Sequence, residues 1–278
     1  MNEILREPKS APLWLVPAGA AISFVGALCG IGGGLFVVPL LYYLRAFPMR
    51  SAVATSVVHV LATAGCATAA ELFQQDHALH YGLLAALGAG ALLGAELGYR
   101  ISKRIDAFWL KAFFALVALA AGAKILYEVG AGRGVYGSGD GAEPVSTGML
   151  ALAFAIGAAG ASLTPLLGLG GGLIFVPALH LSLPDVDYNT IRACSLAVVT
   201  IGATRSAWLY WGEGAIHKRS AWWLGVGGAA GAAFGVLAVH QPGGAWLRGS
   251  RVALGVILVY VAVRFALEAR AARAAQRS

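Results

Sequence analysis

Two glycine-rich stretches are the first features of this sequence that could do chemistry. Gly30 to Gly34 reads GIGGG and Gly168 to Gly172 reads GLGGG, each inside a long apolar run. Glycines that interrupt a helix in an apolar environment leave backbone N–H groups without helical partners, and other groups can approach them closely. If a half-helix begins after each stretch, its N-terminus directs N–H groups and a positive dipole end at the break, which predicts an anion site. Tight helix packing is the alternative role for these glycines. The expected substrate contacts are Gly32, Gly33, Gly34, Gly170, Gly171 and Gly172.

Small hydroxyl side chains follow each glycine stretch. Thr55 and Ser56 lie near the start of the next apolar run, and Ser195, next to Cys194, takes the equivalent place after the second stretch. Neutral O–H donors stabilise anionic oxygen atoms without a permanent ion pair, so a bound anion can leave again. We predict that Thr55, Ser56 and Ser195 donate to the substrate. The alternative is that each hydroxyl bonds a carbonyl of its own helix.

Ionisable residues inside apolar runs need a reason, since a charge at mid-helix costs about 2.5 to 3.5 kcal/mol on insertion scales. His59 lies one turn beyond Thr55 and is the expected group for proton coupling, with a satisfied core imidazole as the alternative. Arg205 could hold the anionic group of the substrate, or it could snorkel or pair with Glu71 or Glu96. Other basic residues near helix ends are interpreted as membrane anchors: Lys111, Lys124, Arg192 and Arg264.

The elements that position these residues must be membrane helices. Hydrophobic residues make up 59% of the 278 residues, charged residues only 12%, and the mean hydropathy is +0.75. Because soluble chains carry about a quarter charged residues, this composition excludes a soluble globular domain. The net charge of +7 lies in short clusters between apolar runs, which favours membrane topology and predicts no nucleic-acid partner. Three cysteines without CxxC or His-rich spacing predict no metal site, and missing catalytic motifs predict that the protein is not an enzyme and needs no cofactor.

Eight apolar blocks are candidates for membrane-embedded segments. They are roughly 13–44, 52–73, 79–99, 108–127, 149–183, 191–211, 221–239 and 252–267. The two blocks that contain the glycine stretches are too long for one crossing of about 30 Å and short for two full crossings. Each is therefore expected to be a helical hairpin broken at its glycines. Whether the arms are half-helices or nearly complete crossings stays open.

The sequence is duplicated. Gly30 to Leu41 and Gly168 to Leu179 agree at eight of twelve positions, including Pro39 and Pro177. The alignment continues through the later blocks, so we predict a first repeat at 1–129, a linker rich in Gly and acidic residues at 130–146, and a second repeat at 147–278. All lie in a single membrane domain.

Membrane topology follows from the positions of Lys and Arg. If each glycine block is a hairpin that returns to its own side, twelve basic residues gather on one face and three on the other. If each block crosses once, one membrane face carries seven basic residues and the other carries eight, so there is no bias. The positive-inside rule favours the hairpins and makes both termini cytoplasmic. Each repeat then has an odd number of net crossings, which predicts an all-α polytopic membrane protein with two inverted-topology repeats, each a broken hairpin plus three transmembrane helices.

The doubled G-[IL]-G-G-G-x-x-x-x-P stretches, at Gly30 to Pro39 and Gly168 to Pro177, resemble the TauE/SafE-type sulfite exporter family of bacterial membrane transporters. The A-x-[TC]-S elements that end at Ser56 and Ser195 are also similar to that family, and the resemblance covers nearly the whole chain. It implies a multi-pass protein of the cell inner membrane that moves sulfite, organosulfonates or similar anions. The second repeat departs by having Cys194 in place of Thr55 and Arg205 in place of Cys66, so the substrate path is expected to be asymmetric.

Together these observations predict a secondary transporter, an exporter of small sulfur-containing anions that works by alternating access around the paired glycine tips. An anion channel and a non-transporting membrane scaffold are the alternatives. The expected partners are the anion, the lipid bilayer and, for coupling, protons or another ion. The particular anion, the direction of transport and the oligomeric state stay open.

Overall fold

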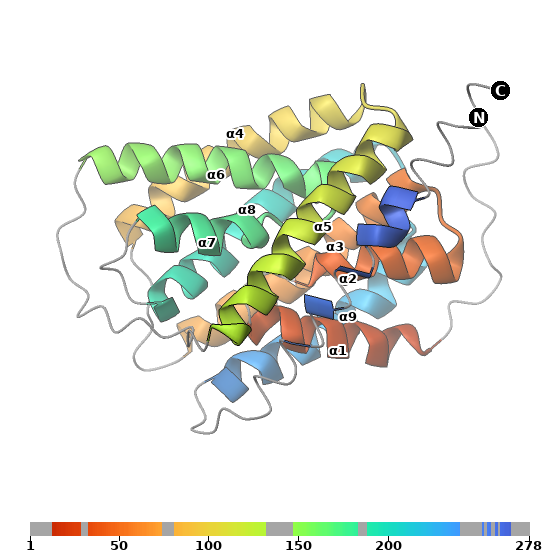
Figure 1. Ribbon diagram of the computed structural model, residues 1–278, viewed down its shortest axis with the longest axis horizontal. Helices are drawn as coiled ribbons and strands as arrows, with labels where there is room; N and C mark the ends of the chain where they lie inside the picture. Colours follow the sequence, from red (N-terminus) through yellow and green to blue (C-terminus); the bar gives the residue numbers. More distant parts are fainter. Residues whose placement is uncertain are drawn as a thin grey trace.

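The computed structural model describes residues 13–28, 33–73, 81–131, 147–182, 188–239 and part of 252–267 (Figure 1). Every regular element in these residues is helical, which confirms the all-α prediction. The helices of the first half are α1 (Leu15–Leu28), α2 (Gly34–Pro39), a π-helix (Leu40–Leu44), α3 (Met49–Leu72), α4 (Tyr81–Ser102) and α5 (Ala107–Gly130). Those of the second half are α6 (Thr147–Leu167), α7 (Gly172–Ser182), α8 (Tyr188–Gly212) and α9 (Lys218–Val239), followed by helical residues between 252 and 267.

Four helices of the described residues have the length and composition of membrane spans: α3, α4, α6 and α9. Each has more than 20 residues, which at about 1.5 Å per residue covers a hydrocarbon core of about 30 Å. Large apolar side chains such as Leu93, Leu97 and Phe234 lie more than half exposed on their outer surfaces. Exposed leucine and phenylalanine at this density suit a lipid environment and would be costly in water, so the chain is a multi-pass membrane protein.

Each of the two overlong apolar blocks contains two helices, with Gly33 before α2 and Gly168 to Gly171 between α6 and α7. The arm α1 has 14 residues, about 21 Å, whereas α6 has 21 residues, about 31 Å. The return arm α2 passes at Pro39 into the π-helix, because proline has no N–H to continue the α-helical ladder. Within the described residues the first arms therefore differ in length, whereas the return arms, Gly34–Leu44 and Gly172–Ser182, have 11 residues each.

Glycine seams join the first helix of each glycine-interrupted block, α1 and α6, to a helix of the other half. Three glycines of α4, one turn apart, face the backbone of α6, and a Cβ atom at any of them would lie 2.0 or 2.1 Å from a carbonyl oxygen. The contacts join Gly90 to Phe154, Gly94 to Ala158 and Gly98 to Ser162. Residue numbers rise together along both helices, so α4 and α6 are parallel.

A matching seam joins α1 to α9. Here Gly227 lies against Val16, Gly231 against Ala20 and Gly235 against Phe24, again with rising numbers on both sides. For the seam glycines, tight packing is therefore the observed role. Figure 1 shows the two seam pairs, α4 with α6 and α1 with α9, along opposite long edges of the molecule.

The helices α3 and α8 occupy the centre between the two seams (Figure 1). They are antiparallel, since Arg50 at the start of α3 pairs with Glu213 just after α8, and Glu71 near the end of α3 pairs with Arg192 near the start of α8. In α3, 61% of the apolar window is buried inside the protein, the highest share among the four spans. This central pair carries most of the polar residues considered below.

Candidate functional site

The two glycine breaks meet in the interior of the protein. A Cβ atom on Gly34, the first residue of α2, would lie 2.1 Å from the carbonyl oxygen of Gly168 and 2.5 Å from Cγ2 of Val60. The buried hydroxyl of Ser56 donates to both breaks, at 2.9 Å from the Gly168 oxygen and 3.3 Å from the Gly34 oxygen. A single side chain of α3 therefore links the hairpin tips of the two halves.

Positive φ angles explain why these breaks need glycine. Gly33 precedes α2 with φ of 75°, and Gly168, Gly170 and Gly171 have φ of 71°, 78° and 76°. Residues with a Cβ rarely adopt this left-handed region. At Gly170 a Cβ atom would also lie 2.6 Å from a methyl group of Val60, so the tips are packed tightly against α3.

A fully buried polar cluster of Ser23, His59 and Thr63 borders the first tip. Nε2 of His59 lies 3.0 Å from Oγ of Ser23, which lies 2.8 Å from Oγ1 of Thr63. Nδ1 of His59 lies 2.9 Å from the carbonyl oxygen of Leu224 on α9. A Cβ atom on Gly33 would lie 3.3 Å from Nε2 of His59 and 3.4 Å from Oγ of Ser23, so the tip backbone reaches the cluster directly.

The hydrogen bonds of this cluster can be arranged for either a neutral or a charged imidazole, because its two hydroxyl groups can reverse direction. Because the Leu224 oxygen can only accept, Nδ1 of His59 donates to it in both states. In the neutral imidazole Nε2 accepts from Ser23, and Thr63 can donate to Ser23. In the imidazolium Nε2 donates to Ser23, Ser23 donates to Thr63, and Thr63 donates to the His59 carbonyl oxygen at 2.9 Å. Every N–H and O–H of the cluster has an acceptor in either state.

The equivalent place in the second half has no counterpart of the His59 imidazole, although the buried hydroxyl of Thr164 lies 3.9 Å from a Cβ atom placed on Gly202. The sequence alignment that pairs Gly30 with Gly168 places Ala161 opposite Ser23, and it places Val198 and Gly202 opposite the histidine and threonine. These residues also meet in the structure, since a Cβ atom on Gly202 would lie 3.3 Å from Cβ of Ala161. The two halves therefore have different side chains at equivalent positions of the backbone.

Other residues singled out from the sequence lie elsewhere. The hydroxyl oxygen of Thr55 accepts the backbone N–H of His217 at 3.1 Å, just before α9 begins. Ser195 is fully buried one turn before Val199, whose methyl group would be 2.9 Å from a Cβ atom on Gly170. Gly172 is the first residue of α7, and Gly32 lies outside the described residues.

Arg205 pairs with Glu96 rather than lying at the tips. Its Nη2 is 2.7 Å from Oε2 of Glu96 on α4, whose other oxygen accepts from Arg100 at 3.2 Å. The Arg205 side chain is 41% exposed and lies six residues beyond Val199, about 9 Å along α8. Of the roles that the sequence allowed, which were substrate binding, snorkelling and pairing with Glu71 or Glu96, the geometry matches the pairing with Glu96.

Two members of the buried cluster were missed from the sequence. Thr63 follows His59 by four residues, so helical spacing alone could have placed both on one face. Ser23 gave no such signal, because it is a single serine in the apolar run of α1 and the second repeat has alanine at the matching position.

The interpretation of Arg192 as a membrane anchor is wrong. Its side chain is fully buried and pairs with Glu71, which is itself 3% exposed. Within the described part of the chain, Nε and Nη1 of Arg192 have no hydrogen-bond partner. The physical reason is that α3 and α8 cross at this point, so a residue near a helix end lies between two helices rather than at the lipid surface.

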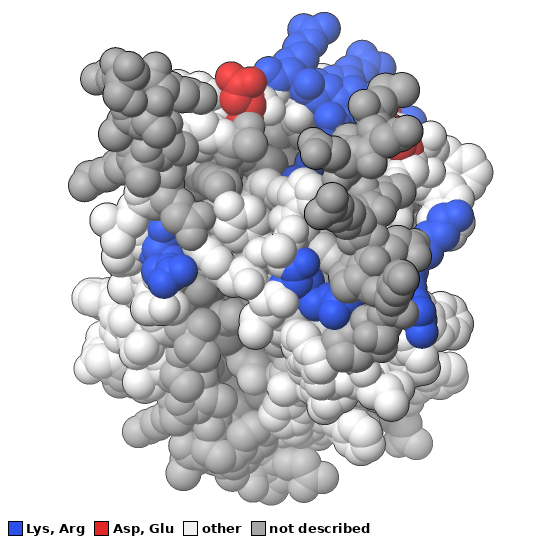
Figure 2. Space-filling model, turned by 90° about the vertical axis from the view of Figure 1, so that its right-hand side faces the viewer, with Lys and Arg blue, Asp and Glu red and all other residues white. Residues whose placement is uncertain are grey.

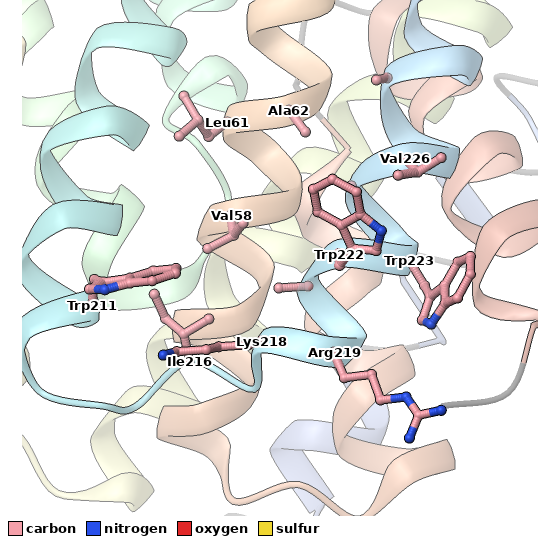
Figure 3. A pocket seen from close by; sticks show the side chains of 13 residues that line it. Val58, Leu61, Ala62, Trp211, Ile216, Lys218, Arg219, Trp222, Trp223 and Val226 are labelled. Atoms are coloured by element: carbon pink, nitrogen blue, oxygen red, sulfur yellow. The ribbon is translucent and has the colours of Figure 1, made fainter. Parts of the chain in front are cut away.

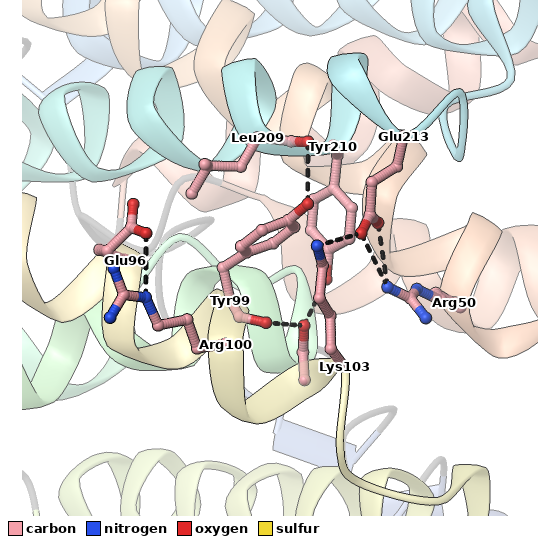
Figure 4. Close-up of polar contacts among 9 residues, drawn as sticks. Arg50, Glu96, Tyr99, Arg100, Lys103, Leu209, Tyr210 and Glu213 are labelled. Carbon is pink, nitrogen blue, oxygen red and sulfur yellow. Dashed lines mark hydrogen bonds and ion pairs between the residues drawn. The ribbon is translucent and has the colours of Figure 1, made fainter.

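Charged residues close the opposite end of the α3–α8 pair (Figure 4). Glu213, in the turn after α8, accepts from Arg50 at 2.9 Å and from Lys103 at 2.8 Å. Burial raises the pKa of Glu213, but the hydrogen bonds from Lys103 and Tyr99 and the nearby positive charges lower it more, so the net shift is downward. The hydrogen bond to Glu213 in turn raises the pKa of Lys103. The ends of α3, α4 and α8 are thereby held together by ion pairs.

The arrangement is that of a helical membrane transporter: broken helices whose tips meet in the protein interior beside buried polar groups. Among the described residues, no three His, Cys, Asp or Glu side chains gather as ligands of a metal would.

Comparison with known proteins agrees with this class. The model of the sulfite exporter TauE/SafE family matches residues 2–125 and 152–278, which is most of the chain. The protein therefore belongs to the TauE/SafE sulfite exporter family, and its membership in a family of membrane transporters is consistent with a protein that is not an enzyme.

Two curated relatives are also named as membrane transporters. The Bacillus subtilis protein named "Probable membrane transporter protein YunE" is 30% identical over 107 residues, which cover 38% of each chain. The Sinorhizobium fredii protein named "Probable membrane transporter protein y4hK" is 28% identical over 128 residues, 45% of this chain and 50% of that protein. The matches thus span at most half the length of these relatives. No solved structure matches significantly.

Proposed function

We propose that this protein is a secondary transporter that exports small sulfur-containing anions, such as sulfite or organosulfonates, across the cytoplasmic membrane. The observation that carries the proposal is the meeting of two broken-helix tips, with Gly34 against the Gly168 carbonyl and Gly33 against the buried His59 cluster. Secondary transporters commonly bind substrate where broken helices meet inside the membrane. The sulfur-containing substrate class follows the description of the family.

Anion binding at the tips would require them to separate. A contact as close as that of Gly34 with the Gly168 oxygen leaves no room for a sulfite ion between the two residues. Separation breaks the bond of Ser56 to the Gly168 oxygen of the other repeat, and its hydroxyl can then donate to the anion. The N-termini of α2 and α7 would supply backbone N–H groups at Gly33, Gly34, Gly171 and Gly172. Ser56 is thus a latch in the closed form and a ligand in the open form.

Helix directions support alternating access by two inverted repeats, 1–129 and 147–278. In an inverted pair, equivalent helices run in opposite directions, and the equivalent helices α3 and α8 are antiparallel neighbours. The two glycine seams are also equivalent: α1 of the first repeat corresponds to α6 of the second, and α4 corresponds to α9, so the α1–α9 seam corresponds to the α6–α4 seam. We propose that one repeat rocks against the other along the α3–α8 contact.

The ion-pair end, with Arg50, Lys103 and Glu213, is the cytoplasmic side in this proposal. The hairpin topology places all three residues on the same membrane face. If each glycine block crossed the membrane once, Glu213 would lie on the face opposite to Arg50 and Lys103. Figure 2 views this end of the molecule, where Lys and Arg side chains gather over the upper and middle parts of the face. A basic face favours the cytoplasm, which would also hold both termini.

Proton coupling through His59 follows from its burial. A buried imidazolium is costly unless a negative charge lies beside it, and an anion at Gly33 would supply that charge. Proton and anion would therefore bind together, and a monovalent anion would cross without net charge. Export then proceeds when the product of anion and proton concentrations is larger in the cytoplasm than outside.

The test is uptake of radiolabelled sulfite and a small sulfonate into proteoliposomes, with and without an imposed pH gradient. We expect saturable flux with counterflow exchange, lost in Gly33→Ala, whose methyl group would lie against Nε2 of His59. Gly65→Ala on α3 is the matched control, because its Cβ would have only an ordinary contact, 3.8 Å from Thr200. Ser23→Ala should retain flux but respond less to the pH gradient.

Each alternative gives a different result in the same assay. Flux that does not saturate and shows no counterflow would identify a channel. Equal behaviour of wild type and Gly33→Ala would favour a scaffold in which the glycines only pack. Absence of flux for every sulfur oxyanion in verified vesicles would overturn the substrate class.

A further inference from the structure

An open apolar groove lies on the outer surface between α3 and α9, beside the end of α8 (Figure 3). Its volume is about 880 Å³, and its walls include Val58 and Ala62 of α3 and Val226 and Ala229 of α9. Gly225 lies in its floor, where a Cβ atom would be 3.5 Å from Cβ of Ala62. The groove is separate from the buried polar cluster, which lies on the inner faces of the same two helices.

The mouth of the groove has the chemistry of a membrane–water boundary. Trp211 and Trp222 are 59% and 68% exposed, and Figure 3 shows Trp211 on one side of the groove and Trp222 and Trp223 on the other. Exposed indole rings collect at the level of lipid headgroups. Lys218 and Arg219 begin α9 at the same level, and Nζ of Lys218 lies 4.7 Å from the centre of the Trp211 ring. Two positive charges therefore stand at one end of an apolar channel.

The length of the groove matches one leaflet of a bilayer. From Lys218 to Ala229 the helix α9 rises about 16 Å, and half of a hydrocarbon core is about 15 Å. A headgroup at the basic end would therefore let an acyl chain lie along the groove toward the middle of the membrane. Neutral lipids fit the apolar walls equally well, but only an anionic headgroup complements the two cations.

We propose that this groove is a binding site for one anionic phospholipid. Lys218 and Arg219 hold the phosphate and the charged headgroup, and an acyl chain packs over Ala62, Gly225 and Val226. The lipid bridges α3 of the first half and α9 of the second half, so its occupancy stabilises the contact between the halves. A second copy of the chain fits less well, because a two-fold contact centred on this groove would bring Lys218 and Arg219 of both copies together.

The binding test uses the purified full chain in detergent, delipidated and titrated with phosphatidylglycerol or phosphatidylcholine. Native mass spectrometry counts the bound lipids, and thermal unfolding follows the stabilisation. We expect phosphatidylglycerol to bind at least tenfold more tightly than phosphatidylcholine, and the double variant Lys218→Gln/Arg219→Gln to lose that preference. Arg104→Gln/Lys124→Gln removes two exposed positive charges elsewhere and should keep it.

A second variant tests the acyl-chain part of the site. Gly225→Leu places a side chain into the groove while the headgroup charges remain, and Gly225 has ordinary helical φ, so the helix accepts it. We expect loss of tight phosphatidylglycerol binding with an unchanged unfolding temperature in the absence of lipid. Equal binding of both lipids to wild type would overturn the proposal. An equal loss of the phosphatidylglycerol preference in the control variant Arg104→Gln/Lys124→Gln would also overturn it, as would full phosphatidylglycerol binding to Gly225→Leu. If wild type forms dimers that Gly225→Leu does not form, the groove binds a second copy of the chain and the proposal is wrong.

Discussion

Replacement of Ser56 by alanine tests whether this hydroxyl holds the two hairpin tips together. The change removes one O–H that serves two buried carbonyl oxygens, at 2.9 Å on Gly168 and 3.3 Å on Gly34. Buried polar groups that lose their partner cost about 1–3 kcal/mol each. Because the second bond is long and carbonyls keep a second lone pair, we expect a loss of about 1.5 kcal/mol in the closed form, which is about a tenfold change in an equilibrium.

The matched control is Ser206→Ala on α8. Ser206 is also fully buried and also donates to a carbonyl oxygen, that of Gly202, at 2.8 Å. This carbonyl lies one turn earlier in the same uninterrupted helix, so it keeps its helical N–H partner when the hydroxyl is removed. We expect a loss below about 0.5 kcal/mol, within the range of changes that break no such feature.

Thermal unfolding in detergent measures the difference. For a chain of this size about 1 kcal/mol shifts the melting temperature by about 2–4 °C, so Ser56→Ala should melt about 3–6 °C below wild type and Ser206→Ala within about 2 °C. Equal melting shifts for the two variants would refute the link between the tips that is inferred from Ser56.

Three further predictions concern packing and charge. Arg192→Met leaves the buried Glu71 carboxylate without its partner and should cost about 3–5 kcal/mol, seen as aggregation on size exclusion, whereas Arg192→Met with Glu71→Leu should recover a monodisperse protein. Gly94→Ala places a Cβ atom 2.1 Å from a carbonyl oxygen of α6 and should lower the melting temperature, whereas Gly212→Ala, with open space around it, should not. Because the pKa of Glu213 is lowered in the folded protein, its stabilisation is complete above about pH 4.5 and is lost as the pH falls further; Glu213→Gln should remove this part of the pH dependence of unfolding.

Each of these predictions has a result that contradicts it. A stable Arg192→Met variant would mean that the ion pair with Glu71 does not hold α3 and α8 together. An unchanged melting temperature for Gly94→Ala would mean that α4 and α6 are not in backbone contact. If Glu213→Gln and wild type lose stability in parallel below pH 4.5, other carboxylates account for the acid sensitivity.

The sequence alone determined the class of this protein and the positions of its breaks. Charge is so scarce that only membrane helices satisfy the composition, and glycine runs in overlong apolar blocks predicted interruptions. The structure agrees, because Gly33, Gly170 and Gly171 adopt backbone angles that other residues avoid. The duplication was equally visible, since it needs only the comparison of one half with the other. The family resemblance followed from the same repeated motif.

The tertiary structure decided which polar residues meet. Rotation of a helix by one residue changes the face of a side chain by about 100°, so no spacing rule could show that Ser56 bonds both tips while its neighbour Thr55 bonds the start of α9. Likewise Ser23 joins His59 only because α1 packs beside α3, and Arg192 is buried only because α3 and α8 cross there. A single sequence records residue types along each helix, whereas contacts between helices depend on crossing angles and rotations that only the packed structure fixes.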